Sequence, residues 1–600
     1  MRTHYPRTPH LPWSPGFTPD DLRAAAPSGP AALAGREVVV TEKLDGENTT
    51  LYRDGLHARS LDSGHHPSRA WVKALQGRIG PGIPPGWRVC GENLYARHSL
   101  AYTGLDSYFY GFSVWDADGR CLPWDDTVHF LGRLGVPVPR VLWRGTYDER
   151  ALRRLRLDTG RQEGFVVRAV EGFGAEEFAL RVAKWVRPGH VQTGTHWMHA
   201  AVVENGLGPA APLWAVRSGA APEPGALLGA LGYDGGQGPD ERTSEAVREA
   251  AGRLDVLGRT GDARLAGVLA TLLHEAPRAA LFPGLRPVLG LPLARRVADL
   301  TGLHRLLHAP FPDEERRAGL IRLAAATDPG VLHAVAAAVP AGAAALEQAE
   351  WSALYAQEAG LLAEDPLGPL REGLRTALAG AGVGSAAADR CWARAREAYA
   401  QGRIGGVEEA VAATWPLRAE PFPRLLHLVG PAGSGKSTLA AAVPGARCVS
   451  LDALRAARGD RSDQSANPAV LRAGLALLDA ELATGGTVVW DATSLTERQR
   501  EPVLAAAARR SALVTQVVSV VGEDELVRRN DARTHRLPAG ALERQLRRYS
   551  PPYPGRAHRI RYAGPDGGIE DRAGGLADGG PWEVPAAVAG PGPEQWGVKD

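Results

Sequence analysis

Hydrophobic and polar positions follow three different patterns along the chain. Up to about residue 200, short apolar or alternating runs are separated by turn residues, which predicts antiparallel strands. Between residues 243 and 415, apolar residues recur at spacings of three and four in runs broken by Pro and Gly, which predicts helices. From residue 424, continuous apolar strands alternate with helical stretches, which predicts a parallel sheet covered by helices.

Two stretches lack such a pattern. The Gly- and Pro-rich residues 206–238 predict a linker or a domain boundary. The Gly-, Pro- and Asp-rich residues 566–600 predict a flexible tail. We therefore expect three domains and this tail, with the domains over residues 1–200, 201–420 and 421–565.

Composition narrows the class of protein. The chain has 600 residues, enough for several domains, and a formal charge of +2, so a site for nucleic acid would have to be a local cluster of arginines. Its four cysteines are far apart and form no metal-binding pattern, which predicts a reduced, cytoplasmic protein. The sequence has neither a secretory signal nor a long uncharged apolar run, so we expect no membrane span.

Lys43 is the first candidate for a catalytic side chain. It follows the β-branched run 38–40, which predicts a strand, and it precedes a turn at Gly46. The local sequence over residues 42–48 is E-K-L-D-G-E-N. A lysine at a strand end, close to an aspartate, can act as a nitrogen nucleophile once it has lost its proton.

Lysine is rare in this chain, which makes each lysine informative. Of 69 Lys and Arg residues, only five are lysines. Arginine has replaced lysine where a positive charge is sufficient, and lysine remains where a nucleophile or a compact charge on phosphate is needed. Three of the five lie in candidate sites: Lys43, Lys184 and Lys436.

Further candidate residues follow Lys43 in a characteristic order. They are a basic residue after a hairpin, an acid at a strand end, an aromatic-rich strand, an acid opening the run E-G-F-V-V-R, and a lysine within a strand. In that order the residues are Arg59, Glu92, Phe112 with Tyr110, Glu163 and Lys184. Each alone is typical of a solvated strand end or an aromatic core. Their joint order, over about residues 35–200, resembles the RNA ligase branch of the covalent nucleotidyltransferases.

The resemblance implies a nucleotide site around Lys43. Lys43 would attack the α-phosphate of ATP and carry AMP, and Arg59 and Glu92 would contact the ribose and phosphate side of the nucleotide. Phe112, or alternatively Tyr110, would stack on adenine.

It also implies how charge on the phosphates is balanced. Glu163 would lie near a divalent metal ion, Mg²⁺ or Mn²⁺, and Lys184 would contact the α-phosphate and help expel pyrophosphate. Relatives often carry two lysines in this last motif, whereas Val182 holds the earlier place here, so only Lys184 is assigned. No run of short strands typical of an OB module follows residue 200, which favours an RNA ligase over a DNA ligase.

The strongest single motif lies near the C-terminus. An apolar strand over residues 424–429 runs into G-P-A-G-S-G-K-S-T and then a helix. This is the P-loop spacing G-x-x-x-x-G-K-S in its strand–loop–helix context, in which glycines let backbone N–H groups surround phosphates. We expect Lys436 to reach the β- and γ-phosphates and Ser437 to bind Mg²⁺. The predicted phosphate-binding residues are Gly430, Gly433, Gly435, Lys436, Ser437 and Thr438.

Later residues indicate what the P-loop serves. Asp452 and Asp491 each follow an apolar strand, and Arg529 and Arg533 lie in a lid-like helical segment. With Arg455, these residues resemble the 5′-OH polynucleotide kinases of RNA end healing, over 422 to about 563. The resemblance implies that Asp452 is the general base, that Arg455 grips a substrate phosphate, and that Arg529 and Arg533 stabilise the transferred phosphoryl group. The role of Asp491 is left open between a metal site and support of its strand.

The helical middle carries no clear chemistry. His274-Glu275 and Thr327-Asp328 resemble the helical metal-dependent phosphohydrolases, with Glu275 in the place of an aspartate. We expect a structural or RNA-docking domain, and a degenerate phosphohydrolase-like metal site is the alternative.

The two ends support one hypothesis. A 5′-kinase makes the phosphate that an ATP-dependent ligase needs, so the sequence predicts an enzyme that uses ATP and Mg²⁺ or Mn²⁺ to repair RNA with broken ends, such as tRNA. The alternatives are a ligase and kinase acting on DNA, and a nucleotide-gated RNA-binding regulatory protein with inactive catalytic domains. A small-metabolite kinase of the same P-loop group would share Lys436 and Asp452. The expected fold is multidomain α/β and α+β: a nucleotidyltransferase domain of mixed antiparallel sheets, an all-helical middle, and a parallel P-loop α/β domain.

Overall fold

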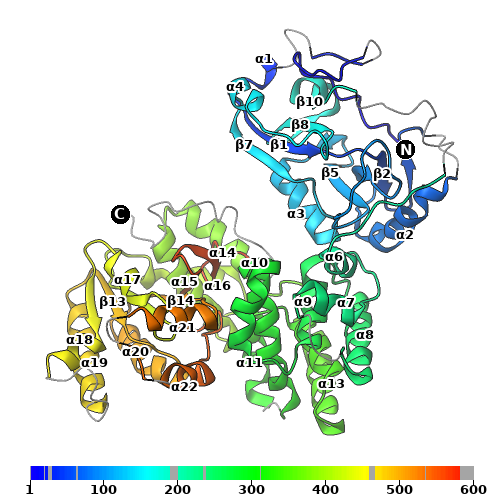
Figure 1. Cartoon of the computed structure of the whole chain (residues 1–600). Coiled ribbons are helices and arrows are strands. Elements are labelled where there is room, and N and C mark those ends of the chain that lie inside the picture. Colours follow the sequence, from blue (N-terminus) through cyan, green and yellow to red (C-terminus); the bar gives the residue numbers. More distant parts are fainter. Residues whose placement is uncertain are drawn as a thin grey trace. The chain divides into compact units, whose positions relative to one another are not determined.

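The computed structural model describes residues 2–18, 21–24, 30–61, 65–189, 201–233, 238–310, 313–458, 467–533, 536–538 and 540–580. Its contacts divide the chain into two compact units (Figure 1). The first unit is Met1–Ser244 with Gly258–Leu265, and the second is Glu245–Leu257 with Ala266–Asp600. The expected boundaries near residues 200 and 420 fall within these units and stay predictions.

The first unit contains two sheets whose strands pair in antiparallel fashion, as predicted. A four-stranded sheet has the order β10-β8-β1-β7, and a six-stranded sheet has the order β3-β2-β4-β5-β6-β9. Their strands are β1 (Glu37–Lys43), β2 (Glu47–Tyr52), β3 (Gly55–Ala58), β4 (Arg88–Asn93), β5 (Phe109–Trp115), β6 (Arg120–Cys121), β7 (Val141–Thr146), β8 (Gly164–Ala169), β9 (Phe173–Gly174) and β10 (Val182–Val186).

Short helices cover these sheets. They are α1 (Pro30–Leu33), α2 (Ala70–Ile79), α3 (Trp124–Leu134), α4 (Glu149–Arg153) and α5 (Phe178–Arg181), with the 3₁₀ turns η1 (Pro67–Arg69), η2 (Gly80–Gly82) and η3 (Ala175–Glu177). Val72 of α2 and Leu131 of α3 pack with Leu51, Val89 and Val114 of the six-stranded sheet. The β-branched run of β1 is fully buried, which fixes the strand that ends at Lys43.

The described part of the Gly- and Pro-rich stretch, residues 206–233 and 238, is not wholly irregular, as a linker would be. It contains α6 (Ala211–Arg217) and α7 (Pro224–Ala230), which bury Leu213 and Leu227. Both helices carry proline in their first turn, where the missing N–H has no intrahelical partner to lose. The prolines therefore start these helices instead of breaking them.

The second unit begins with helices, as predicted for the middle of the chain. They are α8 (Glu241–Val256), α9 (Gly261–Leu272), α10 (Arg278–Leu303), α11 (Asp313–Ala324), α12 (Pro329–Ala338), α13 (Ala343–Glu358), α14 (Gly368–Gly380), α15 (Ser385–Ala400) and α16 (Val407–Ala413), with η5 (His304–His308) and η6 (Trp415–Leu417). The first residues of α8 and α9 belong to the first unit. No cluster of His, Cys, Asp and Glu that could hold a metal ion occurs among the described residues. Asp328 instead caps α12 by accepting from the Gly330 and Val331 amides.

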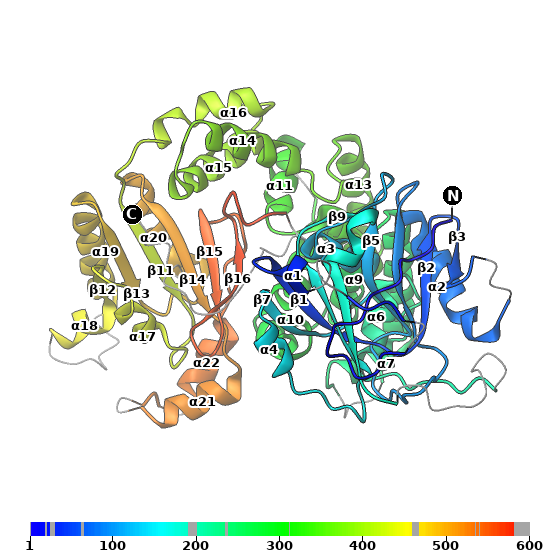
Figure 2. The same cartoon turned by 90° about the horizontal axis from the view of Figure 1, so that it is seen from above.

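A six-stranded sheet completes the second unit, with the order β12-β13-β11-β14-β15-β16 (Figure 2). The first five strands are parallel and β16 is antiparallel. The strands are β11 (Arg424–Val429), β12 (Arg447–Ser450), β13 (Thr487–Asp491), β14 (Leu513–Ser519), β15 (Arg559–Ala563) and β16 (Ile569–Ala573), and the helices are α17 (Lys436–Ala441), α18 (Leu451–Ala456), α19 (Asn467–Ala483), α20 (Glu497–Arg509), α21 (Glu523–Asp531) and α22 (Ala541–Arg548).

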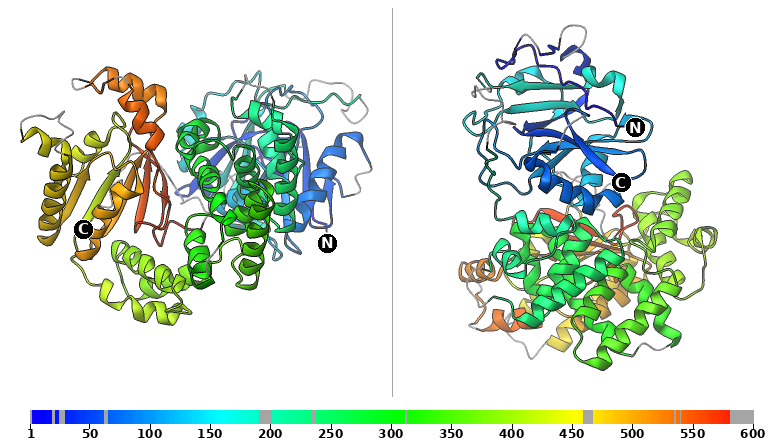
Figure 3. Two further views of the ribbon diagram at one scale, coloured as in Figure 1. Left: turned by 90° about the horizontal axis from the view of Figure 1, so that it is seen from below. Right: turned by 90° about the vertical axis from the view of Figure 1, so that its right-hand side faces the viewer.

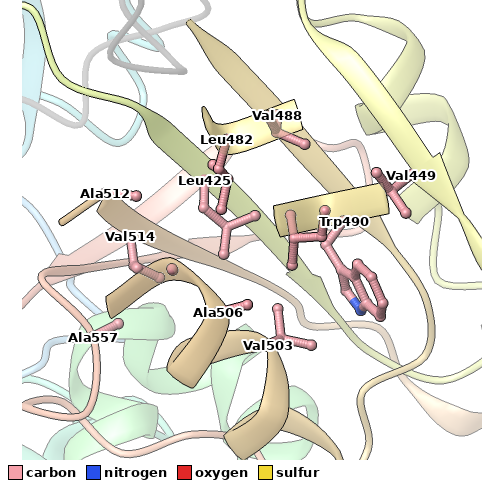
Figure 4. Close-up of a cluster of buried hydrophobic side chains, with 12 residues drawn as sticks. Leu425, Val449, Leu482, Val488, Trp490, Val503, Ala506, Ala512, Val514 and Ala557 are labelled. Atoms are coloured by element: carbon pink, nitrogen blue, oxygen red, sulfur yellow. The ribbon is translucent and has the colours of Figure 1, made fainter. Parts of the chain in front are cut away.

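Two views agree on how the helices of this region lie. Helices α21 and α22 stand at the end of the sheet where α17 begins, and α14–α16 stand at the opposite end (Figures 2 and 3). On one face of the sheet, Trp490 of β13 packs with Leu425, Val449 and Val488, and with Val503 of α20 (Figure 4). This core holds β11, β12 and β13 in register, so that their carboxyl ends meet at one edge.

The prediction of an irregular tail from residue 566 is wrong for 566–580. Ile569 to Ala573 form β16, which pairs with β15, and Ile569, Asp571 and Ala573 are buried. The inward Asp571 forms an ion pair with Arg295 of α10, so the strand lacks the apolar alternation by which strands are recognised. Residues 581–600 lie outside the described residues. Within the described part of the chain, no helix is both long enough and apolar enough to cross a membrane.

Candidate active sites

Three neighbouring strands of the four-stranded sheet bring Lys43, Glu163 and Lys184 together. Lys43 ends β1 and pairs with Gly164, the first residue of β8, so Glu163 lies directly beside it. Lys184 lies in β10, opposite Val166 of β8. Glu163 and Lys184 lie 120 and 141 positions after Lys43 in the sequence, and only strand pairing brings them to it. Lys43 Nζ donates a hydrogen bond to Glu163 Oε2.

The charges of this cluster shift one another's pKa. Burial lowers the pKa of the Lys43 ammonium, but the Glu163 and Glu92 carboxylates outweigh burial, so the pKa is raised above its ordinary value. Burial and the charge of Lys43 lower the pKa of Lys184, which lies 3.8 Å from Asp21 through Nζ and Oδ1. Burial raises the pKa of Glu92 to about 8. Carboxylates and amines with such opposed shifts are typical of catalytic clusters.

The six-stranded sheet contributes Glu92 and the aromatic residues. Glu92 lies in β4 opposite Tyr110 of β5, and its Oε1 accepts a hydrogen bond of 3.2 Å from the Gly46 amide. Phe112 is half-buried, whereas Tyr110 is buried and its hydroxyl accepts from the Asp106 amide at 2.8 Å. Phe112 is therefore the more accessible aromatic face.

Asp45, two residues after Lys43, has a structural role that the sequence did not reveal. Its Oδ2 accepts three hydrogen bonds, from the Ser99 amide at 2.9 Å, the Ser99 hydroxyl at 2.6 Å and the Leu100 amide at 2.8 Å. Its own amide donates to the Tyr102 hydroxyl at 2.9 Å. These bonds fix the loop that follows Lys43 against the loop after β4.

Residues 2–11, here called the N-terminal strap, run from one sheet to the other. At one end, Lys184 donates from its amide to Pro9 O at 2.9 Å and accepts from the Leu11 amide at 2.8 Å. At the other end, the Thr3 amide donates to the Tyr52 hydroxyl at 2.9 Å. The pattern of hydrophobic residues gave no sign of the strap, because it is irregular and its partners are distant in sequence.

Tyr5 is the part of the strap that enters the space between the sheets. Its ring meets Phe112 edge-on at 5.3 Å and Phe178 at 5.2 Å between ring centroids. Burial raises the pKa of its phenol. Arg59, by contrast, is exposed after β3, and its carbonyl oxygen lies 3.0 Å from Nδ1 of His4 in the strap.

The P-loop of the second unit follows β11 at the carboxyl edge of the parallel sheet. Gly433 and Gly435 adopt φ of 85° and 92°, which only glycine adopts readily. Lys436 is buried, and its Nζ donates to Pro431 O at 2.6 Å and to Ser434 Oγ at 3.3 Å. Burial lowers the pKa of Lys436 to about 8.

Acidic residues at the ends of neighbouring strands face the P-loop. The Ser437 hydroxyl donates to Asp491 Oδ2 at 3.0 Å, so the two residues offer adjacent oxygen ligands. Asp452, in the first turn of α18 after β12, forms an ion pair with Arg455 at 2.5 Å. Hydroxyl and carboxylate oxygens are the ligands that Mg²⁺ prefers, usually completed by phosphates and water. Ser437 and Asp491 therefore fit a nucleotide-bound Mg²⁺.

These residues line a cavity of about 1570 Å³ that is rich in arginine. The predicted P-loop residues Gly433, Gly435, Lys436, Ser437 and Thr438 lie on its wall with Asp452 and Asp491. Gly430 adopts φ of 155° at the start of the loop. Seven arginines also line the cavity: Arg455, Arg529, Arg533, Arg536, Arg544, Arg547 and Arg548.

Sequence reasoning missed the contribution of α22 to this cavity. Gln545 of α22 accepts a hydrogen bond of 2.9 Å from the Ala432 amide through Oε1, which ties the helix to the P-loop. Arg544 and Arg548 line the same wall. The local sequence E-R-Q-L-R-R, with basic residues on successive turns, is the signal that could have identified them.

One unit therefore contains a lysine–carboxylate cluster and the other a P-loop, and a P-loop is typical of nucleotide-binding proteins. Residues 36–186 match the family model of RNA ligases, and residues 425–552 match that of an AAA domain. The N-terminal segment is thus similar to RNA ligases, and the C-terminal segment is similar to kinase-like P-loop domains. No curated protein matches the chain.

Several solved structures are similar to parts of the chain. They include the Pnkp1/Rnl/Hen1 RNA repair complex, at 26% identity over 22% of this chain and 45% of that chain with a TM-score of 0.20. A Naegleria gruberi RNA ligase with PPi is 17% identical over 26% of this chain and 50% of that chain, with a TM-score of 0.20. A gluconokinase from Sinorhizobium meliloti is 23% identical over 24% of this chain and 84% of that chain, with a TM-score of 0.19. The chain therefore spans about half the length of the first two, or less.

Proposed function

We propose that the chain is a bifunctional RNA repair enzyme, which phosphorylates RNA 5′-OH ends and joins the resulting 5′-phosphates to 3′-OH ends with ATP. The observation that carries this proposal is the presence of both phosphate sites in one chain: Lys43 beside Glu163 and Lys184, and an arginine-rich P-loop cavity. The product of the second site is the substrate of the first.

In the ligase half, the Lys43 amine attacks the α-phosphorus of ATP, a P–N bond forms, and the bond to the β-phosphate breaks as pyrophosphate leaves. The Lys43 proton passes to the Glu163 carboxylate, to which its Nζ donates a hydrogen bond. Lys184 stabilises charge on the α-phosphate. The 5′-phosphate oxygen of RNA then displaces Lys43 from AMP, and a 3′-OH attacks that 5′-phosphate and releases AMP.

In the kinase half, a 5′-OH attacks the γ-phosphorus of ATP, and ADP leaves. Asp452 accepts the hydroxyl proton, and Lys436 holds the phosphates. Mg²⁺ bound through Ser437 and Asp491 would neutralise charge on the transferred group. Arg529 and Arg533 lie on the cavity wall, where they can stabilise that charge.

The cavity charge supports a polynucleotide over a small metabolite as the kinase substrate. Seven arginines line the cavity with only two acids, Asp452 and Asp491. Arg455, Arg529, Arg536 and Arg547 also pair with acidic side chains. A nucleic acid would bring phosphates to this cationic wall, whereas a neutral sugar would bring none. Arg455, which pairs with Asp452, would contact the phosphate next to the reacting hydroxyl.

Incubation with α-labelled ATP and Mg²⁺ or Mn²⁺, followed by a denaturing gel, tests the ligase half. We expect label on the protein, lost in Lys43→Ala and kept in Lys436→Ala. Absence of label on protein freed of bound AMP would contradict the ligase half and leave the kinase half standing.

The kinase half is tested with γ-labelled ATP and RNA or DNA oligonucleotides that end in 5′-OH. Transfer of label to the 5′ end should be lost in Asp452→Asn and kept in Lys43→Ala. Transfer to gluconate or another small alcohol, without transfer to either oligonucleotide, would contradict a polynucleotide substrate. Equal transfer and joining on nicked DNA would instead favour a DNA-acting enzyme.

A further inference from the structure

A second, much smaller pocket lies inside the second unit, away from the P-loop. It is lined by residues of α10, α14 and α15 and by the segment that follows β16. Its volume, measured as the space that the centre of a water molecule can occupy, is about 50 Å³. Such a pocket has room for a few waters or for one small oxyanion, and it is far too small for a nucleoside.

Arg396 of α15 brings a buried positive charge into this pocket. Arg396 is 6% exposed, and its guanidinium donates hydrogen bonds to the carbonyl oxygens of Gly574 and Gly555, both at 3.3 Å. Within the described parts of the chain, no carboxylate forms an ion pair with it. Burial lowers the pKa of Arg396 to about 10, because the loss of solvent outweighs the opposing effect of the Glu397 and Asp389 carboxylates.

Arg572 of β16 adds a second such charge. It is half-buried, its Nε is buried without a hydrogen-bond partner, and among the described residues it forms no ion pair. The other lining arginines, Arg295 and Arg371, are already neutralised by aspartates. The two lining aspartates are likewise held by arginines, Asp365 by Arg371 and Asp578 by Arg561. The pocket therefore keeps two cationic groups and no spare acid among the described residues.

A buried charge without a counter-charge is costly, and an arginine fork matches the oxygens of a tetrahedral anion. We propose that this pocket binds a phosphate group between Arg396 and Arg572. The phosphate has two sources, free orthophosphate in solution or a terminal phosphate ester of an oligonucleotide. This site does not depend on the two proposed activities, and it is distinct from the P-loop, whose lining residues it does not share.

Calorimetric titration of the full chain with inorganic phosphate tests the site. The parent protein carries Lys436→Ala, so that the P-loop contributes little binding. We expect Arg572→Gln to weaken phosphate binding by about tenfold, because it removes one charge-assisted contact. The control Arg510→Gln removes an exposed arginine that pairs with Asp479 and does not line the pocket, and it should bind like the parent.

Two further arms make the outcome decisive. Arg396→Gln should also weaken binding, and Arg572→Gln keeps the test valid if the more buried Arg396 variant fails to fold. Competition by an oligonucleotide with a 3′-phosphate, but not by its 3′-OH form, would identify the phosphate as an ester, and competition by neither would identify free phosphate. Phosphate affinity equal in the parent and in Arg572→Gln, or no binding to the parent at about 20 mM phosphate, would overturn the proposal.

Discussion

Lys436 should make nucleotide binding to the second unit depend on pH. Burial lowers the pKa of its ammonium to about 8, with Asp491 opposing the shift and Arg533 adding to it. Phosphate oxygens favour the charged form, so a bound nucleotide should return the pKa to at least its ordinary value of about 10.4. Binding above about pH 8 must therefore take up a proton, and affinity should fall as pH rises.

The size of this effect follows from the fraction of free Lys436 that is charged. With a pKa of about 8, that fraction falls from about three quarters at about pH 7.5 to about one tenth at about pH 9.0. The dissociation constant of Mg·ADP should rise about eightfold over this interval, which corresponds to about 1.2 kcal/mol.

Isothermal titration calorimetry with Mg·ADP, in buffers of different ionisation enthalpy, measures both the affinity and the proton uptake. Lys436→Arg is the matched control, because arginine stays charged over the whole interval. Any nucleotide binding in the first unit contributes equally to both proteins, so the difference between them reports Lys436. Equal pH dependence in the two proteins, or binding without proton uptake at about pH 9, would refute the reasoning.

Three further predictions concern the stability of the second unit, measured by urea unfolding. Asp389→Asn should lower the free energy of unfolding by about 3–5 kcal/mol, because it leaves the buried guanidinium of Arg559 without its carboxylate. Asp479→Asn, in an exposed ion pair, is the control. A loss as small as that of the control would contradict this prediction. Trp490→Ala should lower the free energy of unfolding by about 3–5 kcal/mol, because it opens a cavity among the side chains of Figure 4. An unchanged urea midpoint would exclude that packing role. Burial lowers the pKa of His558 to about 4, below its value in the unfolded chain, so the unfolded chain binds more protons and stability should fall by up to about 3 kcal/mol between about pH 6.5 and pH 4. His558→Asn should flatten this decline, and an unchanged slope would assign it to other groups.

The sequence allowed prediction where the chemistry is local. The P-loop and its flanking strand and helix are contiguous, and the run that ends at Lys43 is a buried β-branched strand. Partners that meet only through the tertiary fold could not be foreseen. The buried Asp571 makes the sequence of β16 look polar. The ion pair that allows its burial could not be foreseen, because the partner Arg295 lies 276 positions away in the sequence. The prolines in the first turns of α6 and α7 suggested a linker. Proline breaks a helix only after its first turn, so at these positions it is compatible with a helix.

The candidate sites divide in the same way. Motif order predicted which acid and which lysines lie near Lys43, and β-sheet register brings Glu163 and Lys184 beside it. The environment of Phe112 was not predictable, because Tyr5 approaches it from an irregular segment more than a hundred residues away in sequence.

The strap has a practical consequence for work with the recombinant protein. Its first described residue, Arg2, forms an ion pair with Asp54 at 3.3 Å and lies 4.4 Å above the ring of Tyr52. An affinity tag fused ahead of Arg2 would therefore begin beside the hairpin of β2 and β3, a few residues from the ring that touches Phe112. A purification tag at this end would lie next to the strap, so nucleotide affinities should be measured on protein from which the tag has been removed.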